Sequence, residues 1–293
     1  MPVMPLMPAS YPASCPAICL GLLRDQLALK LLEASLAGAR ELMLFWCGVT
    51  ASSRKDDGSV VSEADHAADA AVRGALDRIG LDAVLVSEES ARHSAEGRDT
   101  FLLLDPLDGT SDFLEHGPEF CVCLAAIHQG RAVAGAIVAP ALKRAWFAGE
   151  HCFAVSLGDT LIVEGQAEAL HVESRPRESA SKAIISRRNG DPRTDAALKD
   201  CGVSSMMMVS SAIKFGMLAE GRADILVRHG RTMAWDIAAG DAVLSAAGGM
   251  VCGFDGAPLL YDGSRPGFDN PPFIAVTRSD MVRPVLDAVQ RAS

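Results

Sequence analysis

The segment Asp105–Thr110 (DPLDGT) constrains the fold most, because it follows a short apolar run at Phe101–Leu104. That run has the length and composition of a buried strand. Proline and glycine then shape a tight loop. The two carboxylates in the loop repel each other unless a cation lies between them, and hard oxygen ligands suit Mg2+ or Ca2+ better than zinc. The segment therefore predicts a strand end that holds a divalent cation. A loop with ordinary Asp-Pro and Asp-Gly turn residues is the alternative.

The composition is typical of a folded protein and argues against several classes of partner. The 293 residues are 49% hydrophobic and 22% charged, so the chain can bury the core of one large domain or two modest ones. A net charge of -10 argues against binding a nucleic acid polymer, since phosphate backbones attract basic faces. A small phosphorylated substrate held by local cations stays compatible. No apolar run approaches the ~18 residues of a membrane span, so we expect no transmembrane segment.

The cysteines and histidines favour neither disulfides nor zinc. The eight cysteines contain no CxxC pair and are typical of a reduced, cytoplasmic protein. Cys121 and Cys123 alternate along a strand-like run and should share one face as small apolar residues. The seven histidines show no spacing of metal ligands.

The expected elements divide the chain into an extension and two halves. Residues 1–22 are rich in Met, Pro, Ala and Ser and contain no Lys or Arg, which predicts a disordered extension, with a leader as the alternative. Residues 23–172 combine two long helices with strands that look antiparallel, which is an α+β pattern. Residues 173–293 alternate strands and helices, which is an α/β pattern.

Four acidic residues recur at the boundaries of expected elements. Glu88 and Asp105 each follow a strand, Asp236 opens a helix, and Asp65 lies in the first turn of another. An acid in a first helical turn can simply favour the helix dipole, and for any single position that is the simpler interpretation. Four such positions together favour a shared role, although the sequence does not bring them together in space.

Four motifs resemble the signatures of the inositol monophosphatase superfamily, and their order and spacing also match. They are Lys55–Asp65, Ser87–Glu89, Asp105–Thr110 and Trp235–Gly240. The resemblance covers about residues 23 to 280. It implies a layered α-β-α-β-α sandwich, with metal bound by the α+β half and substrate bound by the α/β half.

The resemblance implies a magnesium centre of two or three ions. Glu88, Asp105 and the backbone carbonyl of Leu107 would hold one ion. Asp105, Asp108 and Asp236 would hold a second, so that Asp105 bridges the two. Such a pair stabilises both the attacking and the leaving oxygen of an in-line displacement.

The same resemblance implies the groups around the reacting phosphate. The amides of Gly109 and Thr110 would face a phosphate oxygen. Asp65 and the Thr110 hydroxyl would take a proton from the attacking water. The metal ligands Glu88, Leu107, Asp108 and Asp236 would also border the phosphate.

The second half of the chain indicates a substrate with two phosphates. Ser210–Phe215 and Ala219–Asp224 resemble the bacterial 3'(2'),5'-bisphosphate nucleotidases of the superfamily, which implies that Ser211, Lys214 and Arg228 bind the second phosphate. The inositol enzymes typically carry an acid near position 228 and an uncharged residue near position 214. Two cations favour a further anion on the substrate. Exposed helix and strand-end charges are the alternative.

Three further segments are less informative about the substrate. Ser186-Arg187 resembles a segment of the nucleotidase subgroup, but Arg188-Asn189 follows where some relatives have a histidine. Contacts with adenine are therefore not predicted there. The run Met206–Met208 is expected to be a core strand, and Trp235 is expected to pack beside Asp236.

The sequence thus predicts a phosphoric monoester hydrolase of sulfur metabolism. The enzyme would hydrolyse adenosine 3',5'-bisphosphate to AMP and phosphate with Mg2+, and the family implies inhibition by Li+. An inositol monophosphatase or sugar bisphosphatase is the enzymatic alternative. A silent nucleotide- or metal-sensing protein on the same fold is the other alternative, and the intact acids argue against it. A homodimer and a peripheral attachment to the inner membrane are left open.

Overall fold

The computed structural model describes residues 21–46, 52–54, 60–90, 95, 98–172, 181–188, 190–262 and 268–292. The expected extension lies almost entirely outside these residues. The same holds for the expected loop at Lys55–Gly58, for the start of the second half at 173–180, and for Asn189.

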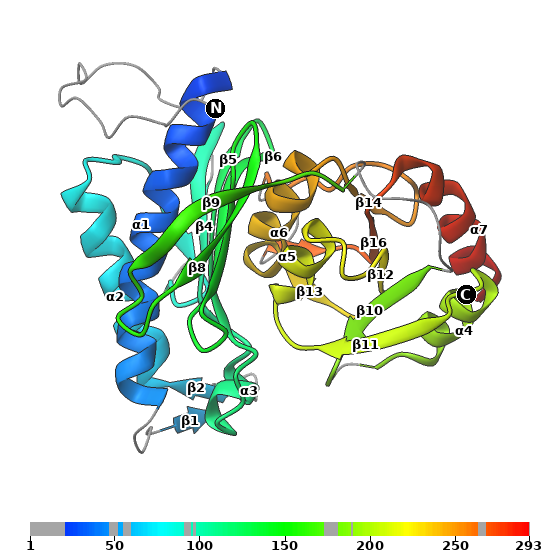
Figure 1. The fold of residues 1–293 in the computed structure, drawn as a ribbon, viewed down its shortest axis with the longest axis horizontal. Helices are drawn as coiled ribbons and strands as arrows, with labels where there is room; N and C mark the ends of the chain where they lie inside the picture. Colours follow the sequence, from blue (N-terminus) through cyan, green and yellow to red (C-terminus); the bar gives the residue numbers. More distant parts are fainter. Residues whose placement is uncertain are drawn as a thin grey trace.

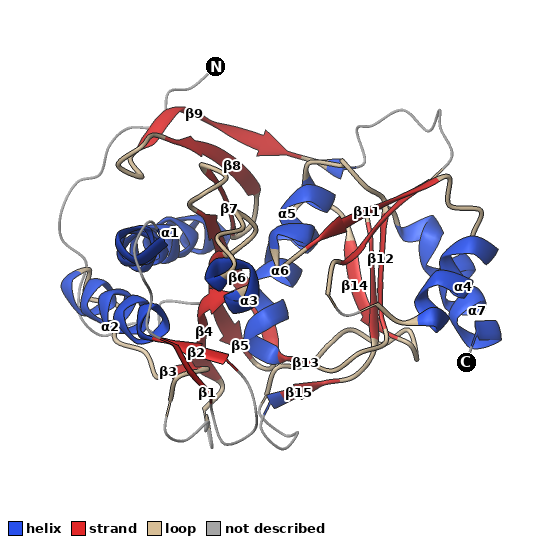
Figure 2. Ribbon diagram, turned by 90° about the horizontal axis from the view of Figure 1, so that it is seen from below, coloured by secondary structure: helices blue, strands red, loops and turns tan. Residues whose placement is uncertain are grey.

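Five layers of helices and sheets follow one another across the molecule (Figure 1). Helices α1 (Gly21–Trp46) and α2 (Glu63–Arg78) cover one face of a seven-stranded sheet. Helices α5 (Ile213–Ala219) and α6 (Ala234–Ala246) lie between this sheet and a five-stranded sheet. The outer face of the second sheet is covered by two more helices, α4 (Pro192–Asp200) and α7 (Val282–Ala292). Figure 2 shows the same layers from below. The predicted α-β-α-β-α sandwich is confirmed.

The seven-stranded sheet takes its strands in chain order, from β3 to β9. β3 is parallel to β4, and every later neighbour is antiparallel, as the sequence predicts for this half. The strands are β3 (Leu85–Ser87), β4 (Thr100–Asp108), β5 (Cys121–His128), β6 (Arg131–Ala139), β7 (Arg144–Ala148), β8 (Cys152–Leu157) and β9 (Val163–Leu170).

The five-stranded sheet has the order β11-β10-β12-β16-β14. β10 is parallel to both of its neighbours, and β16 is antiparallel to both of its own. The strands are β10 (Lys182–Ser186), β11 (Ser205–Val209), β12 (Ile225–Arg228), β14 (Met250–Gly253) and β16 (Phe273–Val276).

Four short strands and two short helices complete the described elements. Each two-stranded pair is antiparallel and follows or precedes a helix of the layers. They are β1 (Ser52–Arg54) with β2 (Val60–Ser62), β13 (Thr232–Met233) with β15 (Asp269–Asn270), the helix α3 (Thr110–Leu114) and the 3-10 helix η3 (Ser279–Met281).

The central helix α6 belongs to the cores of both halves. It packs against β4, β5 and β6 of the first sheet and against β14 of the second, and its residues join one buried cluster with Trp146 and Phe215. Contact is close, because a Cβ added at Gly135 of β6 would lie 2.9 Å from the Cα of Ala239. The predicted domain boundary between residues 172 and 173 stays a proposal. One buried cluster contains residues from both sides of it.

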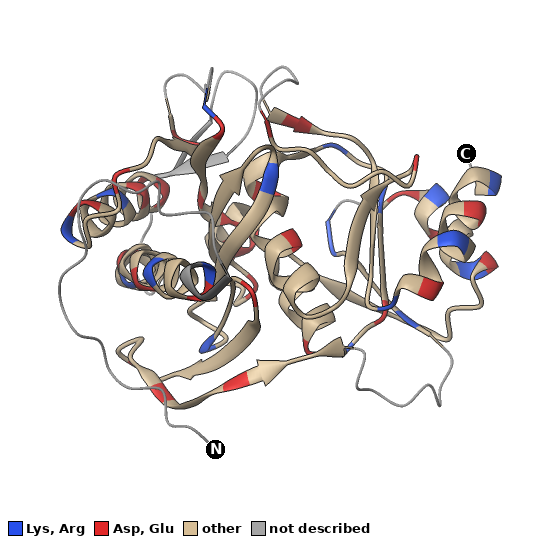
Figure 3. Ribbon diagram, turned by 90° about the horizontal axis from the view of Figure 1, so that it is seen from above, with Lys and Arg blue, Asp and Glu red and all other residues tan. Residues whose placement is uncertain are grey.

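Charge is distributed unevenly among the layers. Helices α4 and α7 carry residues of both signs, whereas the inner helices α5 and α6 carry few (Figure 3). One of these inner charges, Asp241, accepts hydrogen bonds from Tyr261 and Ser245 at 2.8 and 2.9 Å. The others, Lys214 and Asp236, border the cavity described below. Within the described part of the chain, no helix combines the length and hydropathy needed to cross a membrane.

Candidate functional site

Asp105 lies inside β4 and not after it, which corrects the predicted strand end. The strand continues to Asp108, but its pairing with β5 shifts register between Asp105 and Asp108. Pro106 has no N–H to donate to a ladder, and such irregularities redirect neighbouring side chains. The amide of Leu107 donates to Asp105 Oδ1 at 3.0 Å, which fixes the orientation of the carboxylate.

The turn behind these acids requires glycine. Gly109 has φ 95, and a Cβ there would lie 2.8 Å from the carbonyl oxygen of Glu119. α3 begins at the next residue, so the predicted helical turn at Thr110 is confirmed. The Thr110 hydroxyl donates to the Leu107 carbonyl at 3.0 Å. This tight turn holds two predicted site groups side by side.

The structure brings Asp108 together with three of the four boundary acids, Glu88, Asp105 and Asp236. Asp105 is buried, which raises its pKa well above the usual value, and the nearby charges of Glu88, Asp108 and Asp236 raise it further. Burial also raises the pKa of Asp236, again with help from Asp108 and Glu88. These carboxylates come from the end of β3, from β4 and from α6.

This set of donors fits a hard divalent cation. Several buried carboxylates that face one another are stable as anions only if a cation offsets their charge. Their oxygen atoms are the ligands that Mg2+ prefers. Asp236 is also oriented from its own helix, because its Oδ2 accepts the Met233 amide at 2.8 Å in the first turn of α6.

Lys214 and Arg228 lie beside the acids and not on the outer surface. Both line a cavity of about 130 Å³ together with Asp108 and Asp236. Burial lowers the pKa of Lys214, while the charge of Asp108 raises it. Burial likewise lowers the pKa of Arg228, while the charges of Asp236 and Asp108 raise it. The interpretation of the two cations as exposed charges is therefore wrong.

Other residues of this cavity carry little signal in the sequence. Ser211, whose role in binding the second phosphate stays a prediction, lines it, and so does Ser186 at the end of β10. Several apolar or small residues complete the wall and could be found only from the fold. These are Ala212, Phe215, Leu226, Thr232, Ile237 and Phe273.

The turn that carries Ser211 is fastened to the segment that runs from Asp108 to Glu119. Ser211 has φ 58, a conformation that costs energy for a residue with a Cβ. The amide of Ala212 donates to Asp108 Oδ2, and the amide of Ser210 donates to Glu119 Oε2 at 2.8 Å. The Ser210 hydroxyl donates to Asp112.

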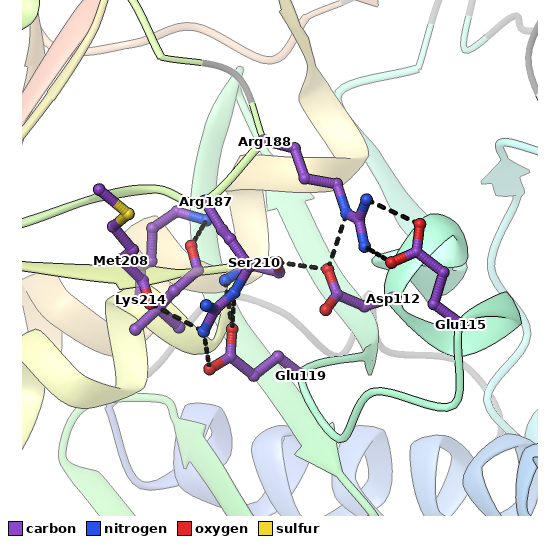
Figure 4. Close-up of polar contacts among 9 residues, drawn as sticks. Asp112, Glu115, Glu119, Arg187, Arg188, Met208, Ser210 and Lys214 are labelled. Atoms are coloured by element: carbon purple, nitrogen blue, oxygen red, sulfur yellow. Dashed lines mark hydrogen bonds and ion pairs between the residues drawn. The ribbon is translucent and has the colours of Figure 1, made fainter.

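Two arginines that follow β10 extend this network to α3 and the segment after it (Figure 4). Arg187 pairs with Glu119, with Nη2 2.7 Å from Oε1. Arg188 pairs with Asp112 at 3.2 Å and with Glu115 at 2.9 Å. Adenine contacts were not predicted at Arg188, and here its guanidinium is held by acids. Sequence reasoning missed Asp112, Glu115 and Glu119, because no motif marks them.

Asp65 is buried in the first turn of α2. α2 packs against β4, the strand that ends two residues before Thr110. The joint role of Asp65 and Thr110 in taking a proton stays a prediction. Glu89 is turned to His66, with its Oε2 3.3 Å from Nδ1.

Two expectations about bulky residues have opposite outcomes. Trp235 is buried and its ring lies 6.1 Å from that of Phe268, so its role in packing is confirmed. The run at Met206–Met208 does form a strand and Met207 packs against the core, but Met206 and Met208 are 50% and 58% exposed, so the assignment to the core is wrong for these two. β11 is an edge strand of its sheet, and the face that carries Met206 and Met208 is exposed.

The chain belongs to the inositol monophosphatase family, whose model matches residues 31–278. Among its relatives, a 3'(2'),5'-bisphosphate nucleotidase CysQ of Salmonella typhimurium is 35% identical over 225 residues, which cover 75% of this chain and 87% of the relative. The protein of that name from Escherichia coli K12 is 33% identical and covers 75% and 86%. The crystal structure of CysQ from Bacteroides thetaiotaomicron has a TM-score of 0.74 and 27% identity, covering 88% of this chain and all of that one (100%).

Proposed function

We propose that this chain is a Mg2+-dependent 3'(2'),5'-bisphosphate nucleotidase that converts adenosine 3',5'-bisphosphate to AMP and phosphate. The observation that carries the proposal is a single cavity bordered by the acids Asp108 and Asp236 and by the cations Lys214 and Arg228. The names of the relatives described above support the same activity.

The acidic end of the cavity would bind the phosphate that is removed. Glu88, Asp105 and the Leu107 carbonyl would hold one Mg2+, and Asp105, Asp108 and Asp236 a second. Two ions are the number we propose. When bound, Mg2+ offsets the charge of the phosphate and lowers the pKa of a neighbouring water.

The chain's own groups then orient the phosphate and accept a proton. The backbone amides of Gly109 and Thr110 begin α3 and would donate to phosphate oxygens. The Thr110 hydroxyl, which donates to Leu107 here, would turn to accept a proton from the attacking water and pass its own to Asp65. The buried position of Asp65 would limit competition from solvent for that proton.

The cationic end would bind the second phosphate of the nucleotide. Arg228 can form two hydrogen bonds to a phosphate, and Lys214 adds a compact charge. Ser211 lines the same wall and would donate its hydroxyl. An inositol monophosphate offers no second anion for these groups, so the cavity favours a bisphosphate.

Phosphate release across a panel of substrates tests this proposal. The panel contains adenosine 3',5'-bisphosphate, its 5'-phosphosulfate counterpart, inositol 1-phosphate and fructose 1,6-bisphosphate, each with and without Mg2+ and Li+. We expect Mg2+-dependent, Li+-sensitive release that is fastest from an adenosine substrate. Equal or faster release from inositol 1-phosphate would contradict the proposal, and no release from any substrate would favour a silent binding protein. The oligomeric state and the location in the cell stay predictions.

A further inference from the structure

The proposed reaction leaves two neighbouring thiols unused. Cys121 and Cys123 lie two residues apart on β5, so their side chains share one face of the sheet. Both are buried, and their sulfur atoms lie 3.6 Å apart. Cys121 Sγ also lies 3.9 Å from Asp108 Oδ2. Two sulfurs and one carboxylate oxygen thus converge beside the magnesium ligands.

The separation of the two sulfur atoms is close to that around a tetrahedral ion, and the Asp108 oxygen would move nearer to bind it. The three ligand atoms all lie within 4.8 Å of one another. A tetrahedral zinc with bonds to sulfur of about 2.3 Å holds its two sulfurs about 3.8 Å apart. The observed sulfur separation of 3.6 Å needs little adjustment. Thiolates select soft cations, whereas Mg2+ prefers oxygen ligands such as the neighbouring carboxylates.

We propose that Cys121, Cys123 and Asp108 form a separate site for a soft divalent cation such as Zn2+ or Cd2+, and that filling this site inhibits the enzyme. Asp108 borders the cavity, so an ion can enter from there, and a water in the cavity can supply a fourth ligand. Inhibition follows because Asp108 would turn from the magnesium centre to the sulfurs. This last step rests on the proposed function, whereas binding of the soft cation does not.

Cadmium binding to the full chain in excess Mg2+ tests the site directly. We expect Cd2+ to produce the near-ultraviolet absorption of a cadmium–thiolate bond, with one equivalent bound. The absorption should disappear in the variant with both Cys121→Ala and Cys123→Ala. It should persist in Cys152→Ala, which removes a buried thiol on β8 as a matched control. An absorption that survives in the double variant, or that is lost in Cys152→Ala, would overturn the assignment.

Inhibition is measured separately on the same proteins. We expect the Cd2+ concentration for half inhibition to rise at least ten-fold in the double variant, relative to its own uninhibited rate, and to stay unchanged in Cys152→Ala. Equal inhibition of the double variant and of Cys152→Ala would place the inhibitory ion at the oxygen ligands. That result would refute the proposal that the cysteine site inhibits the enzyme. The absorption is read without any substrate, so it stays informative if the proposed activity fails.

X-ray absorption at the cadmium edge provides a test that needs no variant. Two sulfur neighbours around Cd2+ in the wild-type chain are expected. A shell of oxygen and nitrogen atoms alone would overturn the proposal, even if the cysteine variants do not fold.

Discussion

Asp105 is a single carboxylate whose properties depend on its neighbours. Its pKa is raised by burial and by Glu88, Asp108 and Asp236, so in metal-free protein its charge opposes folding. The folded-state pKa lies above the unfolded-state pKa of about 4, so Asp105 favours the folded state when it is protonated. This contribution is complete below pH 4 and is lost as the pH rises through the folded-state pKa.

We therefore expect Asp105→Asn to separate stability from activity. Without Mg2+, the free energy of unfolding of the variant should exceed that of the wild type by a margin that grows from pH 4 to pH 8. Its turnover with Mg2+ should fall by at least about a thousand-fold, because the proposed bridging ligand is lost. Urea unfolding at several pH values and phosphate release check both parts. A margin that shrinks with pH, or unchanged turnover, would contradict the assignment.

Gly109 is constrained both by its φ of 95 and by the 2.8 Å approach to Glu119. We expect Gly109→Ala to lower stability by about 2 kcal/mol through strain and overpacking, and to lower kcat at least ten-fold by shifting the Thr110 amide. Gly80→Ala is the matched control, since Gly80 has φ +64 and no atom within 4 Å of an added Cβ. That control should lose stability but keep the kcat of the wild type. A Gly109→Ala enzyme with unchanged kcat would exclude the proposed phosphate contact.

The sequence reveals residues that belong to motifs better than residues that support them. Asp105, Asp108 and Asp236 are recognised because a short local pattern accompanies each one. Asp112, Glu115 and Glu119 have no such pattern. Their partners Arg187, Arg188 and Ser210 lie far along the chain, so only the folded arrangement identifies them.

At the scale of elements, α3 and the ends of β10 and β11 are joined by charged contacts. Arg188 contacts Asp112 and Glu115, and Asp112 in turn accepts the Ser210 hydroxyl. This connection holds the turn of Ser211 against α3 and Asp108. It should therefore govern nucleotide affinity more than the chemical step.

We expect Arg188→Ala to raise the KM for the bisphosphate three- to ten-fold with less than a two-fold change in kcat, because Asp112 is buried and loses a partner. Steady-state kinetics at low and high salt check this. The difference in KM between the variant and the wild type should become smaller at high salt. Arg193→Ala removes an exposed pair with Asp191 and should change neither constant. A fall in kcat at constant KM would indicate a different role for Arg188.

Some elements leave a weaker pattern than others. The strands β5 and β6 are buried along most of their length, and their apolar runs predict them well. β9 is exposed at all but its last residue, so no apolar period marks it, and hydrogen bonds to β8 hold it in place. β4 was predicted too short, because Pro106 usually ends a strand.

At the scale of the whole molecule, the proposed metal site takes acids from both halves, so a bound cation should stabilise the folded chain. We expect Mg2+ at a hundred times its Kd to raise the free energy of unfolding at neutral pH by about 2.7 kcal/mol, and EDTA to reverse this. Thermal unfolding across a Mg2+ titration measures the effect. An unfolding temperature that does not respond to Mg2+ would exclude a site built from these carboxylates.

The order of layers could be predicted, but the sharing of the core could not. Alternating patterns and the family motifs indicate the two halves. The packing of α6 against both sheets follows from long-range contacts that no local pattern encodes. The cavity that combines Asp236 of α6 with Asp108 of β4 depends on that packing.

The most direct test of the substrate assignment compares two nucleotides that differ only in one phosphate. We expect kcat/KM for adenosine 3',5'-bisphosphate to exceed that for adenosine 3'-monophosphate by at least ten-fold, since a hydrogen bond to a charged group contributes about 1.5–3 kcal/mol. In a variant with Lys214→Ala and Arg228→Ala, this ratio should fall to near one while activity on the monophosphate persists. A ratio that is unchanged by the two substitutions would contradict the claim that these cations select the second phosphate.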